Sequence, residues 1–352
     1  MLDPFVYKSD RLRILFGRGA IDKIAAEVER LKMSRVMMLC SHGRVAFAQS
    51  VAARLGPRAV GICNAARPGM PSAAFDEIVA ELARLSADGF VCLGGGSPIG
   101  LAKAVAAQTK IPFIAVVTTY SGSEMAPRWY IGGGGNERTG QTPDALPASA
   151  IYDPDLTLDL PFATSAASCM NAMAHAVESL YGADANPVVV AMAEEAVRLL
   201  GSALPRLKAN PRDIEARTDA LYGAWLAAAF RATVGISHTI AQRVRQHFGT
   251  EHARTHAVML PYAVAFNRAA APAAMERMAR ALRAGDPAQA LYDINVACGL
   301  ATGLSALGMR EEDIPRAVEV VVKRNFSNPR PAAPADIENV IRQAFAGRPP
   351  KF

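Results

Sequence analysis

The stretch from Phe90 to Ala104 constrains the fold more than any other part of the sequence. An apolar run typical of a buried strand ends in three successive glycines, and a helical pattern begins directly afterwards. Three glycines permit backbone conformations closed to other residues and let a ligand approach the main chain closely. We expect Ser97 to cap the helix and Pro98 to lie in its first turn, where no N–H is missed. The free N–H groups at such a helix start form an anion site, so the stretch predicts either a phosphate-binding turn or a tight turn without a ligand.

Two further strand patterns end in polar residues that belong with this turn. The apolar run 114–117 is followed by hydroxyl side chains, and the run 36–40 is followed by Ser41 to Arg44. Parallel strands bring their carboxyl ends together, where open α/β sheets bind ligands, here a dinucleotide. No acidic residue follows the run 36–40 to hold a ribose 2′-hydroxyl and Arg44 is nearby, so both NADH and NADPH stay open. The predicted cofactor-binding residues are Ser41, Gly94, Gly95, Gly96, Ser97, Thr118, Thr119 and Ser123.

The first half of the chain alternates strand and helix patterns. Alternating apolar and polar residues over 5–16, followed by Gly17 and Gly19, predict a hairpin. The segments flanking Gly132 to Asn136 predict a second one. Helices are expected over 20–31, 45–55 and 72–85, with strands over 36–40, 60–63 and 151–154. This alternation indicates a doubly wound, Rossmann-like parallel sheet.

The second half changes character. From Pro161 onward, Ala, Leu and Met recur at helical spacing, and prolines fall near the ends of the patterns. Helices are expected over 163–181, 187–209, 212–231, 235–248, 256–284, 287–306, 311–324 and 335–346. We therefore predict a nucleotide-binding α/β domain over 1–158 and an all-α substrate and catalytic domain over 159–352.

Composition excludes several classes of protein. The net charge of +6 comes without a Lys/Arg block, which suggests solubility or an anionic substrate rather than nucleic-acid binding. No run of apolar residues is long enough to span a membrane, and the first residues lack the basic start and apolar core of a signal peptide. Five scattered cysteines suggest reduced thiols, so we expect a cytoplasmic protein.

Polar residues also gather in the second half. Four of the six histidines, His238, His247, His252 and His256, occur close together. Asn171 and His175 stand four residues apart, so they share one helix face. On an apolar face such a pair is either a satisfied part of the core or, beside a cofactor crevice, part of a site.

Together these motifs resemble the iron-containing alcohol dehydrogenase family. They are Gly94 to Ser97, Thr118 to Glu124, Asn171 with His175, and His238 with His252. Within that family the chain is most similar to the maleylacetate reductase branch, through Gly122 to Met125, Ile151 to Pro154, Met170 to Ala172, His252 to Val258 and Asn328 to Pro331. The resemblance implies a dehydroquinate synthase-like fold with its site in the cleft between a nucleotide-binding and a helical domain. It also implies a homodimer that uses NADH or NADPH to reduce maleylacetate, a small anionic oxo-acid, to 3-oxoadipate in the catabolism of aromatic compounds.

The metal-dependent members of the family use one Asp and three His, and the Asp position is Asn171 here. A neutral amide oxygen is a much poorer ligand for a divalent cation than a carboxylate. The maleylacetate reductases that this chain resembles carry the same Asn and work without metal, so we predict no catalytic metal. His175, His238 and His252 are then expected to give hydrogen bonds or positive charge to a keto oxygen and a carboxylate.

One position departs from the family. Gln242 stands where the family usually has a histidine near the nicotinamide, and glutamine cannot exchange a proton near neutral pH. Either His238, Tyr120, His247 or water delivers the proton, or the substrate differs, or activity is weak. The predicted catalytic residues are Asn171, His175, His238, Gln242 and His252.

Other functions stay open beside this one. Arg243 and Arg245 either bind substrate carboxylates or are solvated charges on a helix face. The alternatives to the reductase are a metal-dependent alcohol dehydrogenase acting on another substrate and a nucleotide-binding homologue that has lost redox chemistry. A scaffold protein is disfavoured because it explains neither the glycine turn nor the inward-facing polar residues.

Overall fold

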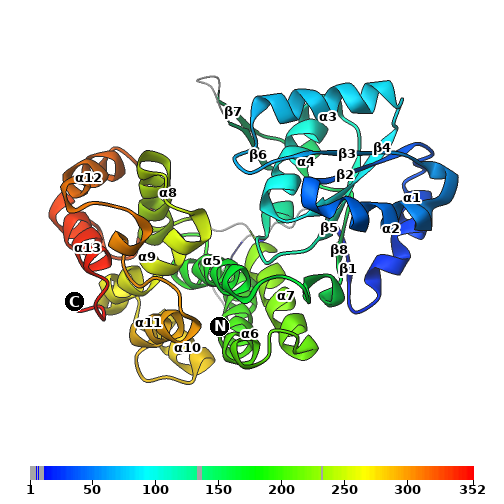
Figure 1. Cartoon of the computed structure of the whole chain (residues 1–352). Coiled ribbons are helices and arrows are strands. Elements are labelled where there is room, and N and C mark those ends of the chain that lie inside the picture. The colour runs from blue at the N-terminus through cyan, green and yellow to red at the C-terminus, as the bar shows by residue number, and fades with distance from the viewer. Residues whose placement is uncertain (1–4, 6, 8–11, 133–136, 231–232) are drawn as a thin grey trace. The chain divides into compact units, whose positions relative to one another are not determined.

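The structure is a computed structural model, and it describes residues 5, 7, 12–132, 137–230 and 233–352. The chain forms two compact units (Figure 1). The sheet unit ends at Leu160, and the helical unit begins at Pro161 and also includes the described residues Phe5 and Tyr7. Each unit has a buried apolar core of its own.

A parallel sheet of six strands forms the centre of the sheet unit. Its strands are β1 (Arg13–Phe16), β2 (Val36–Ser41), β3 (Ala59–Ala66), β4 (Gly89–Gly94), β5 (Phe113–Val117) and β8 (Ser149–Tyr152). Their order is β1-β8-β5-β4-β2-β3, and every neighbouring pair is parallel. All residues of β4 and β5 are buried, as expected for strands covered on both faces.

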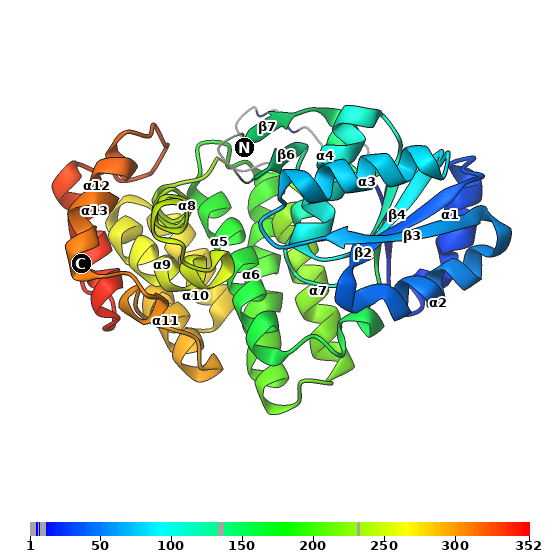
Figure 2. The ribbon, with the colours of Figure 1, turned by 45° about the horizontal axis from the view of Figure 1, so that its top comes forward.

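Helices cover both faces of this sheet (Figure 2). On one face, α1 (Ile24–Arg30) and α2 (Val45–Leu55) pack on alternate residues of β2, Val36 and Met38 among them. On the other face lie α3 (Ser72–Arg84) and α4 (Gly96–Thr109). The doubly wound, Rossmann-like sheet expected from the sequence is confirmed.

The first predicted hairpin lies in large part outside the described residues, and the second is confirmed. Residues 13–16 form β1, which pairs in parallel with β8; residues 6 and 8–11, the rest of the first hairpin apart from residues 5, 7 and 12, lie outside the described residues. The second hairpin consists of β6 (Arg128–Ile131) and β7 (Arg138–Gln141), which pair antiparallel as a separate two-stranded sheet. Of its predicted turn, residues 133–136 lie outside the described residues.

The described part of the helical unit contains helices and no strand. They are α5 (Phe162–Tyr181), α6 (Pro187–Ala209), α7 (Ile214–Ala228), α8 (Ile236–Phe248), α9 (His252–Asn267), α10 (Pro272–Leu282), α11 (Pro287–Cys298), α12 (Ile314–Val322) and α13 (Pro334–Ala346). The single helix predicted over 256–284 is wrong. The chain leaves the helical conformation at Ala271, and Pro272 starts a new helix.

Helix α9 also begins earlier than predicted, because Glu251 caps it. The Glu251 carboxylate accepts hydrogen bonds from the backbone N–H groups of Ala253 and Arg254 at 3.0 and 2.9 Å. Satisfying these otherwise unpaired donors fixes the helix start at His252. His252 and His256 therefore stand one turn apart on the same face of α9.

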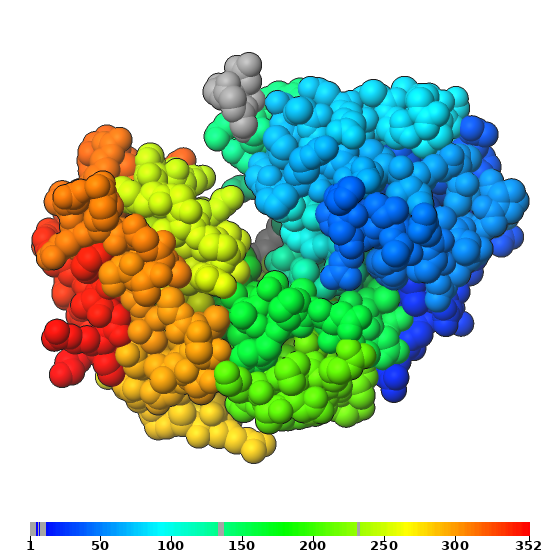
Figure 3. All heavy atoms as spheres, viewed as in Figure 1, coloured from blue at the N-terminus to red at the C-terminus, as the bar shows by residue number. Residues whose placement is uncertain are grey.

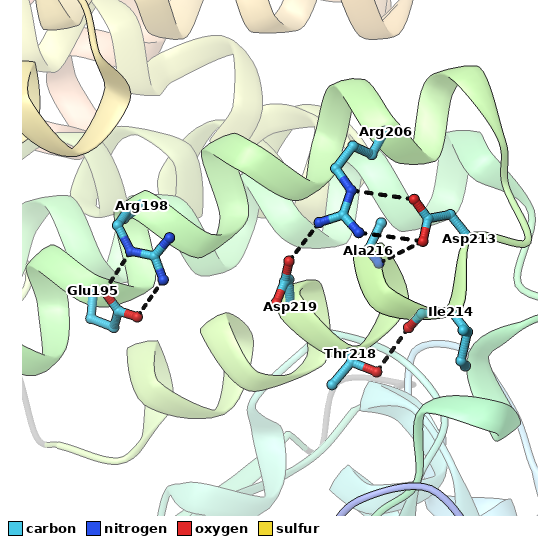
Figure 4. A network of polar contacts seen from close by, with 8 residues as sticks. All are labelled: Glu195, Arg198, Arg206, Asp213, Ile214, Ala216, Thr218 and Asp219. Atoms are coloured by element: carbon cyan, nitrogen blue, oxygen red, sulfur yellow. Dashed lines mark hydrogen bonds and ion pairs between the residues drawn. The ribbon is translucent and has the colours of Figure 1, made fainter.

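Helices α6 and α7 are joined by a network of charged side chains (Figure 4). Arg206 of α6 donates to Asp219 of α7 at 2.7 Å and to Asp213 at 3.2 Å. Asp213 in turn caps α7 by accepting from the Ala216 N–H at 3.0 Å. Because these charges are partly exposed, the network orients the helix pair more than it stabilises it.

Helices α8, α9, α12 and α13 share one apolar core, with Tyr262 and Val321 fully buried in it. In the space-filling view the surface of this C-terminal part of the chain is coloured yellow to red (Figure 3). Within the described ranges, none of the helices combines the length and the apolarity that crossing a membrane requires.

Candidate active site

The glycine turn lies at the switch point of the parallel sheet. Strand β2 has β3 on one side and β4 on the other, so the chain reverses its direction across the sheet between β3 and β4. Open α/β sheets bind ligands at the carboxyl ends of strands at such a point. The turn that follows β4 and Ser41, the last residue of β2, both lie there.

The structure moves the predicted helix start by two residues. Gly95 is the N-cap of α4 and the helix begins at Gly96, so Ser97 lies inside the first turn and the prediction that it caps the helix is wrong. Pro98 lies in the first turn, as predicted. The first intrahelical bond runs from the Ile99 N–H to the Gly95 carbonyl at 3.1 Å, which leaves the N–H groups of Gly96 and Ser97 free for an anion.

Glycine is required at two positions of this turn. Gly94 has a φ of 155°, and a Cβ there would lie 2.7 Å from the Pro98 ring. A Cβ on Gly95 would lie 2.5 Å from Cγ2 and 2.6 Å from Oγ1 of Thr119. The backbone of the turn therefore passes directly against the segment that follows β5.

That segment carries the other predicted cofactor residues. Gly94 pairs with Val117 in the sheet, so Thr118 and Thr119 emerge beside the turn, and the Thr118 N–H donates to the Gly94 carbonyl at 3.1 Å. The Thr119 hydroxyl is buried and has no hydrogen-bond partner in the protein. An unpaired buried hydroxyl beside free helix N–H groups fits a phosphate-bearing cofactor, because the ligand would satisfy these groups.

Buried charges below the turn were not predicted from the sequence. Lys103 of α4 is 4% exposed, and its Nζ donates to the carbonyl of Ser123 at 2.7 Å. Glu124 is fully buried and accepts from the Tyr152 hydroxyl at 2.5 Å. Burial lowers the pKa of Lys103 to about 8 and raises the pKa of Glu124. Lys103 thus ties α4 to the segment that holds Ser123.

In the helical unit, four histidines from three helices form one cluster, which we call the histidine cluster. It consists of His175 of α5, His238 of α8, and His252 and His256 of α9. Ring centroids are 4.1 Å apart for His175 and His238, 4.4 Å for His238 and His256, and 4.7 Å for His252 and His256. The sequence-predicted His175, His238 and His252 are thus brought together, and His256 joins them.

A buried carboxylate that the sequence reading missed holds one of these rings. Glu178 of α5 accepts from Nδ1 of His238 at 2.6 Å and from the backbone N–H groups of Gly235 and Ser237 at 3.0 and 2.8 Å. On its other side, Nε2 of His238 lies 3.2 Å from Nε2 of His175. Glu178 follows Asn171 by seven residues and His175 by three, so its place on their helix face was a signal in the sequence.

Most of the clustered rings are uncharged near neutral pH. Burial lowers the pKa of His175 and of His256 well below the usual value, and repulsion from His238 and His252 adds to it. Burial of its ring also lowers the pKa of His252, to about 4, with the Arg245 charge contributing, although the residue as a whole is exposed. His175 and His252 therefore offer hydrogen bonds rather than positive charge.

The donor set does not fit a divalent metal. Asn171 is 4% exposed, and its Oδ1 has no hydrogen-bond partner in the protein. Among the described residues, no group of three or more His, Cys, Asp and Glu side chains is arranged to hold a metal ion. The position that would supply the anionic ligand supplies a neutral amide, which hard and borderline cations bind weakly.

Helix α8 carries Gln242, which replaces the usual histidine of the family, and two arginines. Gln242 and Arg245 follow His238 by one and two turns and are half-buried on its side of the helix. Arg243 is half-buried, and neither arginine forms an ion pair with the described residues. His247, by contrast, is exposed on the opposite face of α8, which disfavours it as the proton source in place of Gln242.

Comparison with known proteins places the chain in a family. The model of iron-containing alcohol dehydrogenases matches residues 12–154, and the C-terminal model of the Fe-containing alcohol dehydrogenase family matches residues 165–345. The chain is 42% identical over 348 residues to a maleylacetate reductase of Sphingobium indicum, covering 98% of this chain and 99% of that one. It is 41% identical to one of Burkholderia cepacia, with the same coverage. The crystal structure of maleylacetate reductase from a Rhizobium species superimposes with a TM-score of 0.95 at 38% identity, covering 99% of this chain and 100% of that one. The chain belongs to the iron-containing alcohol dehydrogenase family.

Proposed function

We propose that this protein is an NAD(P)H-dependent maleylacetate reductase that converts maleylacetate to 3-oxoadipate in the degradation of aromatic compounds. The observation that carries the proposal is the similarity to curated maleylacetate reductases, at 36 to 42% identity over nearly the whole chain. The glycine turn of the sheet unit supports it with free N–H groups and an unpaired hydroxyl for a diphosphate.

Each unit has its own part in this proposal. The main chain at Gly95, Gly96 and Ser97 binds the cofactor phosphates, with the Thr119 hydroxyl beside them. When bound, NADH or NADPH supplies the hydride. In the helical unit, the rings of His175 and His252 hydrogen-bond the substrate, and His238 holds the ring of His175.

Hydride addition to the carbon–carbon double bond conjugated with the keto group would place negative charge on the keto oxygen, as an enolate. Hydrogen bonds from His175, His252 and the Asn171 amide stabilise that charge. A proton from water would then add to the carbon next to the ketone and complete the saturated oxo-acid. Product analysis separates this reaction from reduction of the keto group, since 3-oxoadipate keeps its ketone and a hydroxy acid does not.

The half-buried cations of α8 support an anionic substrate. Arg245 is close enough to His252 to contribute to the lowering of its pKa, and among the described residues it has no acidic partner. A partly desolvated guanidinium without a counter-ion binds a carboxylate well. We propose that Arg245, with Arg243, meets a carboxylate of the oxo-acid.

We also propose that the reaction needs no metal, on the ground of the amide at Asn171. The test is to follow the near-ultraviolet absorbance of NADH and NADPH with a panel of oxo-acids that includes maleylacetate, before and after chelation. We expect maleylacetate to be reduced fastest and chelation to leave the rate unchanged. N171D is the matched variant, because it restores a carboxylate beside three histidines and should bind iron or zinc in metal analysis.

The alternatives give different results in the same assay. A metal-dependent alcohol dehydrogenase would lose its activity on chelation and recover it with added metal. A nucleotide-binding homologue without redox function would bind NADH and oxidise none with any oxo-acid. The homodimer, the cytoplasmic location and the absence of nucleic-acid and membrane partners stay predictions.

A further inference from the structure

The strongest unexplained feature of the helical unit is the buried carboxylate of Glu178 and the hydrogen-bond donors around it. Glu178 and His238 are each 1% exposed, and their side chains are 2.6 Å apart. Burying a carboxylate is costly unless hydrogen bonds satisfy its oxygens. Here the backbone N–H groups of Gly235 and Ser237 and the Nδ1 of His238 converge on it.

These contacts fix which nitrogen of His238 carries the proton. An ionised carboxylate only accepts hydrogen bonds, so Nδ1 of His238 must be the donor. When the ring carries only that proton, Nε2 is an acceptor, and its partner at 3.2 Å, Nε2 of His175, donates to it. One carboxylate thereby sets the tautomers of two rings in sequence.

Glycine at 235 is part of this arrangement. A Cβ there would lie 2.9 Å from Oε1 of Glu178 and 3.1 Å from Oδ1 of Asn328. Asn328 itself accepts from the N–H of Ile236 at 3.3 Å, so the start of α8 is held from two sides. The backbone approaches the carboxylate as closely as it does because Gly235 has no side chain.

We propose that Glu178 is a positioning residue, which holds His238 with Nδ1 protonated and His175 with Nε2 protonated so that these rings face the reacting oxo-acid in one defined state. The proposal rests on the proposed function for its chemistry. Glu178 itself touches neither substrate nor cofactor. Its effect passes through His238, as an orienting carboxylate acts on a catalytic histidine.

The decisive variant is E178Q. Glutamine has the same shape as glutamate, but it replaces one of the two accepting oxygens with an NH₂ donor. An amide offers one oxygen, so its NH₂ group must face either a backbone N–H or Nδ1 of His238. We expect His238 to lose its single tautomer. The expected kcat falls roughly 100-fold, the order seen for orienting partners, while the KM for NADH changes by less than about twofold.

The matched control is D286N. Asp286 also caps a helix of this unit, accepting the backbone N–H groups of Ala288 and Gln289 at the start of α11, and among the described residues it hydrogen-bonds no histidine. D286N should lower the thermal midpoint slightly and leave kcat and both tautomers unchanged. A merely structural role for Glu178 would make the two variants behave alike.

A readout independent of activity comes from nitrogen NMR of protein labelled only at its six histidines. His238 and His175 signals are assigned by single substitution. In the wild-type protein we expect Nδ1–H at His238 and Nε2–H at His175, and in E178Q a mixture. An Nε2–H tautomer at wild-type His238, or an E178Q protein with unchanged tautomers and unchanged kcat, would overturn the proposal.

The two proposals fail separately. If the wild-type protein reduces no oxo-acid, the proposed function is wrong, and the NMR measurement still decides whether Glu178 sets the tautomers. If E178Q does not fold, the wild-type tautomers remain a complete test, and E178D provides a second variant. It keeps a carboxylate and should keep the tautomers.

Discussion

At Gly95 the missing side chain is a packing requirement imposed by Thr119. The distance from a Cβ there to the threonine side chain, 2.5 Å, is shorter than any ordinary contact between heavy atoms. Thr119 is held in place by its neighbour Thr118, whose N–H donates to the Gly94 carbonyl. A methyl group at Gly95 must therefore displace either Thr119 or the turn.

We predict that G95A weakens NADH binding by at least about tenfold, or 1.4 kcal/mol, because either displacement moves the free N–H groups away from the phosphates. Fluorescence titration with NADH measures the dissociation constant. G285A is the control, since a Cβ on Gly285 meets nothing within 4 Å. An unchanged dissociation constant in G95A would place the phosphates elsewhere.

The sequence predicted some site residues and missed others for a physical reason. Glycines, and hydroxyls at the ends of apolar runs, are unusual enough to stand out, so Gly95 and Thr119 were predicted. Lys103 and Glu178 were missed because a lone charge in a helical pattern normally faces water. Their burial depends on partners far along the chain, Ser123 and His238, which helical spacing alone does not reveal.

The boundaries of helices, too, were predicted where the local sequence defines them and missed elsewhere. Helix α2 was predicted at both ends, because local apolar periodicity and Gly56 define it. The break between α9 and α10 was missed, since the apolar pattern continues through it. The start of α9 was missed because Glu251 caps it in place of the usual Ser, Thr, Asp or Asn. That start places His252 and His256 on one face of α9.

At the level of elements, Lys103 joins α4 to the segment after β5. The free energy cost of burying its charged form depends on pH. Burial lowers its folded-state pKa to about 8, below the 10.5 of a free lysine. Between these values the unfolded chain binds more protons than the folded one, so stability rises with pH. Below both values the cost of burying the charge is constant.

We predict that, relative to K103M, the free energy of unfolding of the wild-type protein rises by about 2 kcal/mol from pH 7 to pH 10. Urea unfolding of both proteins across this range measures the difference. K110M is the control, since Lys110 ends the same helix but its side chain is exposed and pairs with Asp144. A difference that stays flat with pH would mean that Lys103 is solvated in the folded protein.

The charge of the whole molecule bears on how substrate arrives. A net charge of +6 attracts a dianionic oxo-acid over distances longer than a hydrogen bond. Salt screens this attraction, with a Debye length of about 8 Å at physiological ionic strength. Contacts made in the bound state are screened less. Removing a charge that acts only through the overall field should therefore matter little at high salt. Removing an arginine of α8 that contacts the substrate should matter at any salt concentration.

We predict that kcat/KM for maleylacetate falls several-fold as ionic strength rises, while kcat stays constant, because salt slows encounter and leaves the bound complex unchanged.

Two double variants of equal net charge then separate the effect of the overall field from that of direct contacts in the site. R243Q/R245Q removes the half-buried cations of α8, and R283Q/R348Q removes two exposed ones. If the field alone acts, both lose kcat/KM equally at low salt and recover the wild-type value at high salt. We expect R243Q/R245Q to keep a deficit at high salt, since a partly desolvated guanidinium binds its carboxylate directly. Equal behaviour of the two would remove Arg243 and Arg245 from the substrate site and leave them as surface charges.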